Sequence, residues 1–176
     1  VNKGASNLDD LDLNPLLVQA DPGDNPRYCK DKIINKVPDT LDEKIWLEIK
    51  DKITQKEKNY FEYNIENTFR SVGTRLSHYI YKKFGDGQLS KDTINIKLIG
   101  SAGQSLGAFL TKGIKLLIEG DCNDYVGKGL SGGTIVVYPS SNSKLISNEN
   151  TIIGNTVLYG ATSGRLYASG QAGERF

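Results

Sequence analysis

Short apolar blocks recur every twenty residues in the second half of the chain. Within most blocks the aliphatic residues occupy alternate positions, as expected of strands whose side chains alternate between two faces. The blocks are Ile94–Leu98, Ile114–Ile118, Thr134–Tyr138 and Gly154–Leu158. A fixed period of this length is typical of repeated units that stack on one another, and not of a conventional layered domain.

Two further columns keep the same spacing between the blocks. One holds small residues at Gly100, Gly120, Ser140 and Gly160, and the other holds aliphatic residues at Leu106, Val126, Ile146 and Leu166. Glycine adopts positive φ without steric cost, so the small residues suit corners between strands. Successive units can then pair in parallel, about 4.8 Å apart. The sequence therefore predicts a mainly β fold, a parallel β-helix with about twenty residues per turn over residues 91–176.

The inward face of this predicted coil follows from the same alternation. The first, third and fifth residues of each strand are expected to point inward: Ile94/Ile96/Leu98, Ile114/Leu116/Ile118 and Thr134/Val136/Tyr138. No unit can bury its own apolar side, so the units are expected to be stable only as a stack.

A helical lead-in with a short strand is predicted over residues 40–90. The stretch Thr40–Glu43 fits a capping box, followed by isoleucines at four-residue spacing. Alternating apolar residues predict a strand over Tyr60–Ile65. A second apolar stripe predicts a helix over about Thr68–Phe84, and close packing against another backbone would account for Gly73 inside it.

Residues 1–39 are rich in Asp, Asn and Pro, and they predict an interdomain connector without firm secondary structure. Several leucines in this stretch are apolar enough to dock on a neighbour.

Composition limits the function classes. The net charge of +1 gives no broad basic surface for nucleic acid, and no apolar run approaches the roughly 18 residues of a membrane span. The two cysteines, Cys29 and Cys122, lie in unlike contexts and are expected to be reduced thiols and not a disulfide. The chain has no methionine and stops inside the repeat, so it is expected to be a piece of a longer protein.

The stretch Gly100–Gly107 has the pattern GxxGxxxG, and a glycine-rich loop can cradle a phosphate with backbone amides. It has neither the Walker spacing nor GxGxxG. Its glycines also fall in the repeat columns, so the interpretation as structural corners is favoured.

Three carboxylates, Glu119, Asp121 and Asp124, lie close together in sequence at one predicted corner. Such residues could bind a cation or perform acid–base chemistry on a polysaccharide. No second carboxylate falls in the equivalent positions of the neighbouring units, so a solvated corner is favoured.

His78 is the only histidine, and it lies beside Tyr79 on the second predicted helix. A surface or interface histidine is favoured over a metal ligand. The serines at positions 101, 105, 131, 163 and 169 have no other histidine as a partner, and Lys82–Lys83 is too short for a nucleic-acid footprint. The sequence thus predicts no catalytic, cofactor-binding or metal-binding residue in this chain.

Several motifs resemble one family closely. They are Gly100–Phe109, Glu119–Gly133, Val136–Pro139, Ile153–Asn155, Leu158–Thr162 and Ala172–Phe176, preceded by the similar lead-in Asn67–Ser77. Together they resemble the C-terminal GXGXG domain of the glutamate synthase large (alpha) subunit. The resemblance is continuous from about residue 60 to the end of the chain, and it is looser over residues 1–59.

The resemblance implies a right-handed β-helix that acts as a structural scaffold. Glutamate synthase converts glutamine and 2-oxoglutarate into two glutamates. An amidotransferase domain releases ammonia to a synthase domain that carries FMN and an iron–sulfur cluster. The expected partners are those two domains and a small NAD(P)H-oxidising flavoprotein subunit or domain, and the electron donor is NADH, NADPH or ferredoxin. The expected location is the cytoplasm or a plastid.

No catalytic role carries over to a residue of this chain, since neither Cys29 nor Cys122 lies in a cluster motif. An unpaired last rung would favour self-association. Two alternatives from other classes stay open at this point: a β-helix carbohydrate-active enzyme, and a nucleotide-binding module that uses Gly100–Gly107.

Overall fold

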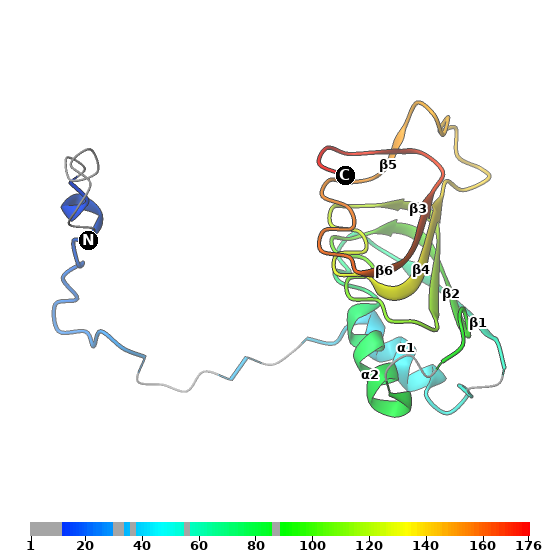
Figure 1. Ribbon diagram of the computed structural model, residues 1–176, viewed down its shortest axis with the longest axis horizontal. Coiled ribbons are helices and arrows are strands. Elements are labelled where there is room, and N and C mark those ends of the chain that lie inside the picture. Colours follow the sequence, from blue (N-terminus) through cyan, green and yellow to red (C-terminus); the bar gives the residue numbers. More distant parts are fainter. Residues whose placement is uncertain (1–11, 30–33, 36–37, 55–56, 86–88) are drawn as a thin grey trace. The chain divides into compact units, whose positions relative to one another are not determined.

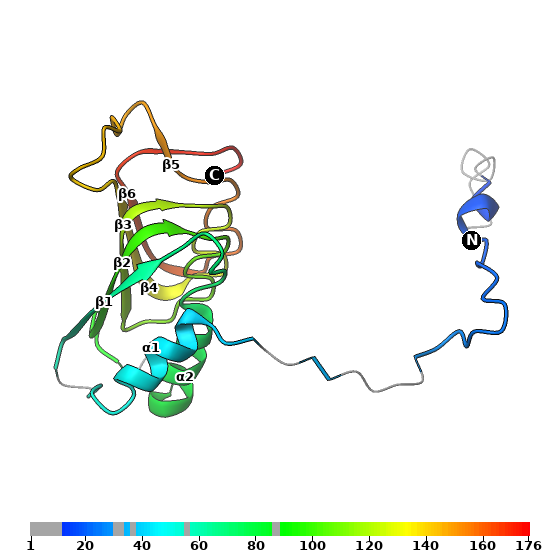
Figure 2. The same cartoon turned by 180° about the vertical axis from the view of Figure 1, so that it is seen from behind.

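The computed structural model describes residues 12–29, 34–35, 38–54, 57–85 and 89–176. Its contacts divide the chain into two units, residues 1–37 and residues 38–176. The described part of the first unit is exposed, apart from a half-buried Pro22, and contains a short 3₁₀ helix, η1 (Asn14–Leu16), whose first amide donates to the Asp12 carboxylate over 2.9 Å. All other elements belong to the second unit (Figures 1 and 2).

The second unit contains two α-helices and several parallel strands. In chain order the elements are α1 (Leu41–Ile49), β1 (Asn59–Ile65), α2 (Thr74–Phe84), β2 (Ile94–Ala102), β3 (Ile114–Cys122), β4 (Ser131–Tyr138), β5 (Thr151–Ile153), β6 (Ser163–Ala168) and β7 (Gln171–Ala172). Five strands form one parallel sheet in the order β1-β2-β3-β4-β6, and β5 pairs with β7 in a small second sheet. The two helices lie side by side next to the lower end of the sheet in Figure 1.

The predicted start of the first helix is confirmed. The Thr40 side chain accepts a hydrogen bond from the Glu43 amide over 3.3 Å, so it caps α1. The other half of the capping box does not form, because the Glu43 carboxylate instead accepts a 2.6 Å hydrogen bond from the Tyr79 hydroxyl of α2. The strand predicted over Tyr60–Ile65 is also confirmed, as β1.

The predicted start of the second helix at Thr68 is wrong. Residues 68–73 form an irregular segment, and α2 begins only after Gly73, whose φ of +101° is left-handed and not helical. The expectation of close packing at this glycine is correct. A Cβ at Gly73 would lie 3.1 Å from the Leu110 side chain and 3.4 Å from the Gly107 Cα.

Within the five-stranded sheet, the twenty-residue period holds along the whole of one strand pair only. Between β2 and β3, Ile94 faces Ile114 and Gly100 faces Gly120, so these partners are twenty residues apart. The bridge from Thr111 to Ser131 keeps that spacing, but further on Lys115 faces Thr134, nineteen residues away. One residue is therefore missing from the second repeat within β4, between Ser131 and Thr134.

This missing residue reverses the predicted facing of β4. A slip of one residue moves every side chain of a strand to the opposite face. Ile135 and Val137 are fully buried, whereas Val136 and Tyr138 are half-buried on the other face. The predicted inward set Thr134/Val136/Tyr138 is thus wrong, while the inward sets of β2 and β3 are confirmed.

The period fails again after β4. A long loop, residues 139–150, follows this strand, and β6 then pairs with β4 so that Ile135 faces Leu166, thirty-one residues on. The block Gly154–Leu158, which was predicted as a strand, forms a turn. Val157 is buried within it, and Leu158 has a left-handed φ of +58°.

The predicted right-handed parallel β-helix is therefore wrong. The structure has one five-stranded parallel sheet flanked by α1 and α2, an α/β-like arrangement, and the described strands do not close into a solenoid. The spacing between paired strands is thirty-five, twenty, nineteen and thirty-one residues in succession, so no constant coil length exists. The apolar columns predicted parallel pairing correctly, but not closure.

One core spans the sheet and both helices. Its centre consists of fully buried aliphatic residues from the inner face of the sheet, from the two helices and, at Leu110, from the segment before β3: Ile45, Ile49, Leu76, Ile80, Ile94, Ile96, Leu98, Leu110, Ile114, Leu116, Ile118, Ile135 and Val137. Among the described residues, no helix combines the length and apolar character needed to cross a membrane.

Candidate functional site

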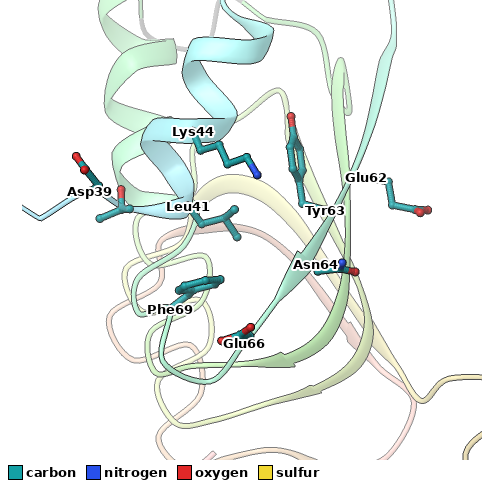
Figure 3. A pocket seen from close by; sticks show the side chains of 9 residues that line it. Asp39, Leu41, Lys44, Glu62, Tyr63, Asn64, Glu66 and Phe69 are labelled. Atoms are coloured by element: carbon teal, nitrogen blue, oxygen red, sulfur yellow. The ribbon is translucent and has the colours of Figure 1, made fainter.

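A cleft of about 680 Å³ lies between the start of α1 and strand β1 (Figure 3). Its lining consists of Asp39, Thr40, Leu41, Lys44, Glu62, Tyr63, Asn64, Glu66 and Phe69. A second hollow of about 620 Å³ is also lined by Asp39, Thr40, Leu41 and Phe69. It continues along the start of α2 to His78. We refer to the two together as the α1 cleft.

The side chains of the α1 cleft come from three elements. Figure 3 shows Lys44 reaching from α1 toward Tyr63 of β1, with Leu41 and Phe69 forming an apolar wall below them. Burial, followed by a hydrogen bond with Glu48, raises the pKa of Tyr63, so its phenol stays neutral at physiological pH. The cleft thus has an apolar wall and a rim of mixed charge.

A buried carboxylate in the lining of the second hollow holds the two helices together. Asp42 of α1 accepts hydrogen bonds from three backbone amides at the start of α2: Gly73 at 2.7 Å, Arg75 at 2.9 Å and Leu76 at 3.3 Å. Burial raises the pKa of Asp42, although these three hydrogen bonds act in the opposite direction. A negative charge at a helix N-terminus is favourable, so Asp42 serves as a cap contributed by another helix.

A second polar contact joins the exposed sides of the two helices. The Glu43 carboxylate lies 3.1 Å from the Arg75 guanidinium, and it also accepts the Tyr79 hydroxyl hydrogen bond. That hydrogen bond is the main reason why the pKa of Tyr79 is raised. The Tyr79 ring stacks on Trp46 with a centroid distance of 5.0 Å. These groups are engaged in holding α1 to α2.

His78 is exposed on α2 and lines the α1 cleft. It also borders a separate groove of about 400 Å³ together with Ser77 and Ser131. Neither serine hydroxyl is directed to the imidazole by a hydrogen bond, because Ser77 donates to the Gly73 carbonyl and Ser131 to the Leu110 carbonyl. The structure therefore brings one predicted serine near His78 without forming a nucleophile–base pair.

The Gly100–Gly107 stretch forms structural corners. Its amides are engaged with neighbouring segments: Ser105 donates to the Asp124 carbonyl and Gly107 to the Val72 carbonyl. A Cβ at Gly100 would lie 2.2 Å from the Ile65 carbonyl oxygen. A phosphate would meet carbonyl oxygens here, so the geometry disfavours the phosphate cradle and favours close backbone approach as the reason for glycine.

The three acidic residues do not converge. Glu119 forms an ion pair with Lys97 at 2.8 Å, and the hydrogen bond from that lysine lowers the pKa of Glu119. The Asp124 carboxylate accepts hydrogen bonds from the amide and side chain of Asn155 at 2.8 and 3.1 Å. Within the described part of the chain, no group of three or more His, Cys, Asp or Glu residues could hold a metal ion.

The cysteines do not fit an iron–sulfur cluster. Such a cluster is held by about four thiolates, or two with two histidines, whereas the whole sequence contains two cysteines and one histidine. Cys122 is buried in the core, where burial raises the pKa of its thiol, and Cys29 is exposed in the first unit. Burial of a neutral thiol is typical of a structural cysteine.

Sequence reasoning missed the α1 cleft. The alternation around Tyr63 predicted only a strand, and Lys44 fell on the polar face of a predicted helix. The position of Phe69, in an irregular segment before α2, depends on the left-handed turn at Gly73. The one signal in the sequence is that Phe69 lies close to Gly73, a glycine near the start of the second predicted helix.

Comparison with known proteins defines the relationship. The family model described as the GXGXG motif matches residues 42–176. The chain is 59% identical over its whole length to the glutamate synthase [NADPH] large chain of Azospirillum brasilense. It is 46% identical, again over its whole length, to the glutamate synthase [NADH] of Saccharomyces cerevisiae. It is 41% identical over 97% of its length to the ferredoxin-dependent glutamate synthase 2 of a Synechocystis strain.

The chain spans only 12%, 8% and 11% of these three relatives. What it shares with them is therefore one segment of much longer proteins. With the family model matching most of its residues, the chain belongs to the GXGXG motif family, and its relatives are glutamate synthase large chains and glutamate synthases.

Proposed function

We propose that this chain serves as a non-catalytic scaffold domain of a glutamate synthase large chain. In this role it supports the amidotransferase domain and the synthase domain with FMN and an iron–sulfur cluster. The full protein would convert glutamine and 2-oxoglutarate into two glutamates, with electrons from NADH, NADPH or ferredoxin. The main support is the identity of 59% along the entire chain with one such large chain.

The range of relatives supports a role that does not depend on the electron donor. The names of the relatives include NADPH, NADH and ferredoxin, and each is at least 41% identical to this chain over nearly its full length. A segment that bound one donor would be expected to differ among the three groups. A shared structural task is consistent with similarity across all of them.

The use of polar side chains gives a second line of support. Asp42 caps α2, Asp124 holds Asn155, and Thr134 donates to the Asp92 carboxylate over 2.9 Å. Such hydrogen bonds stabilise the fold and leave these groups engaged with the protein itself. The two cysteines do not fit a cluster, so the cluster belongs in this proposal to other segments of the large chain, where we place FMN as well.

Single substitutions in a full-length large chain that contains this segment test the proposal. His78→Ala and Ser105→Ala should leave the turnover number for glutamine-dependent glutamate formation within about twofold, because neither side chain touches reacting atoms. Leu110→Ala removes a fully buried side chain and should lower thermal stability and activity together.

Thermal unfolding of each variant provides the control. A variant that loses activity about a hundredfold while its melting temperature is unchanged would contradict the scaffold role. Micromolar binding of FMN, a nucleotide or glutamine to the 176-residue chain alone would contradict it as well.

A further inference from the structure

The parallel sheet has one covered face and one partly open face. The inner face packs in the core. The outer face, on the opposite side of the sheet, includes exposed or half-buried residues at Tyr60, Glu62, Lys97, Lys115, Leu117, Val136, Arg165 and Tyr167. Parallel sheets occur almost only with both faces covered. An open outer face is therefore unusual and indicates a missing neighbour.

An apolar row crosses this outer face. Leu117 of β3 lies directly opposite Val136 of β4, and Val136 lies opposite Tyr167 of β6. Three adjacent strands thus present apolar side chains side by side, and Tyr167 is 55% exposed. The slip that turns Ile135 and Val137 inward is what places Val136 in this row. Leu117 and Val136 are half-buried, so the row is a partly exposed apolar strip, and contiguous apolar surface is typical of an interaction site.

A groove of about 410 Å³ lies beside the apolar row. Its lining includes Leu117 and three lysines, Lys58, Lys97 and Lys115. Lys97 is neutralised by Glu119 at 2.8 Å and by Glu62 at 3.4 Å.

The other two lysines differ from Lys97. Among the described residues no ion pair is formed by Lys58 or Lys115, whereas the groove's other carboxylate, Asp92, accepts the Thr134 hydroxyl and lies 3.8 Å from Lys91. The groove therefore presents, next to apolar surface, two lysines that form no ion pair within the described part of the chain.

We propose that the outer face binds an acidic segment from another part of the same large chain. The segment would place apolar side chains over Leu117, Val136 and Tyr167 and a carboxylate near Lys58 and Lys115. This proposal rests on the scaffold function, because it names the surface through which the scaffold acts. It implies that the acidic segment docks from outside the 176 residues.

Charge and chain length favour this occupant over a second copy of the chain. The relatives are eight- to twelvefold longer than the matched segment, so most of the polypeptide is available at high local concentration. In a face-to-face pair of copies, each groove would meet an identical surface that again carries Lys58 and Lys115. Like charges brought together in this way oppose association.

Lysine labelling tests the proposal. The 176-residue chain and the full-length large chain are treated with an amine-acetylating reagent, and the modification rate of each lysine is measured by mass spectrometry. Lys58 and Lys115 should react about tenfold more slowly in the full-length protein, because an interface core excludes solvent. Lys144, exposed in the loop 139–150, is the comparison site and should change less.

Two full-length variants sharpen the test. Val136→Lys places a charge in the apolar row and should restore the labelling of Lys115, while Ile146→Lys, at a side chain 53% exposed in the loop, should not. Lys115→Glu, a surface change that leaves the core intact, should restore the labelling of Lys58. Circular dichroism of each variant in the 176-residue chain verifies its fold.

Equal labelling of Lys115 in the two proteins would overturn the proposal. Concentration-dependent protection already present in the 176-residue chain would also overturn it, by identifying a second copy as the occupant. Should activity in the full-length protein depend on this segment while Lys115 stays reactive, the scaffold function would stand and the proposed surface would fall. A catalytic role found for this segment would instead remove the scaffold function itself.

Discussion

The sheet side and the turn side of the second unit are stabilised by different means. The sheet side, β1 to β4 with β6, packs aliphatic side chains into the core. The turn side comprises the turns at residues 104–109, 124–129 and 155–160, which stack through backbone hydrogen bonds. The stability of the first depends on side-chain volume, and that of the second on backbone conformation.

The turn side repeats one unusual conformation. Ser105, Tyr125 and Thr156 all have left-handed φ values, of 64°, 62° and 54°. The amide of each donates to a carbonyl of the next turn along, at Asp124, Asn155 and Glu174 respectively. Non-glycine residues adopt this conformation at a cost, so the stacked hydrogen bonds must compensate. The turn side therefore carries strain that the sheet side does not.

The largest effect is expected at a corner of the sheet side. Gly120→Ala would place a Cβ 2.0 Å from the Gly100 carbonyl oxygen at a φ of +151°. Backbone cannot move aside cheaply, so the free energy of unfolding in urea should fall by about 4 kcal/mol. Gly160→Ala is the control on the turn side, where φ is +68° and nothing lies within 4 Å. It should cost about 1 kcal/mol; equal losses would contradict the steric explanation.

Two neighbouring valines of β4 test the register of the sheet side. Val137 is fully buried and Val136 is half-buried on the outer face. Val137→Ala should lower the free energy of unfolding by about 2 kcal/mol, and Val136→Ala by under about 1 kcal/mol, since only the first leaves a core cavity. Chemical denaturation of both variants measures the difference. The reverse order would restore the facing predicted from the twenty-residue period.

A smaller loss is expected from a polar contact on the turn side. Asp124→Ala removes the acceptor of two hydrogen bonds from Asn155. Because this carboxylate is accessible to water, the free energy of unfolding should fall by about 1 kcal/mol. Asp121→Ala, three residues before the start of the same turn, is the matched control and should change less. Denaturation midpoints that agree for the two variants would show that Asp124 does not join the turns.

The outer face of the sheet should give a pH-dependent effect. The hydrogen bond from Lys97 lowers the pKa of Glu119, so the unfolded chain binds its proton more readily. Glu119 therefore stabilises the fold above its ordinary pKa of 4.5, and this contribution is lost as pH falls through the lowered value. Thermal melts at about pH 6 and about pH 3 should differ less for Glu119→Gln than for the parent chain. Glu149→Gln, at an exposed loop position, should leave that difference unchanged.

The smallest effect should have the opposite sign. Thr156 is β-branched and has a φ of +54°. Thr156→Gly relieves this strain but adds entropy to the unfolded chain, so the net gain in unfolding free energy should be about 0.5 kcal/mol. Differential scanning calorimetry can resolve it as a slightly higher melting temperature. A clear loss would show that the threonine side chain contributes packing that outweighs the strain.

Within the sheet side, prediction from sequence succeeded for β2 and β3 and failed for β4. Alternation, strict in Ile94–Leu98 and broken only by Leu117 in Ile114–Ile118, predicted the inner face of β2 and β3 correctly. In β4 the stretch Ile135–Tyr138 is apolar throughout, so alternation could not identify the face. The decisive event, one residue lost before Thr134, lies in a glycine pair that gives no apolar signal.

The candidate site could be predicted less well than the fold. The α1 cleft depends on where α2 begins, and that start depends on Asp42, thirty-one residues before the amide of Gly73 that it accepts. A single sequence gives no sign that a carboxylate in one helix caps another. The resemblance to glutamate synthase identified the family correctly, but the fold that it implied, a closed coil, is not what the structure shows.

The loop 139–150 has a consequence for engineering. It leaves the sheet after β4, yet β6 still pairs with β4 and the turn at 155–160 still stacks on the turn at 124–129. Its length is therefore decoupled from the hydrogen-bonded ladders on either side, and most of its residues face solvent. A fluorescent label or a short peptide tag grafted into this loop would report on the protein while leaving both ladders in place.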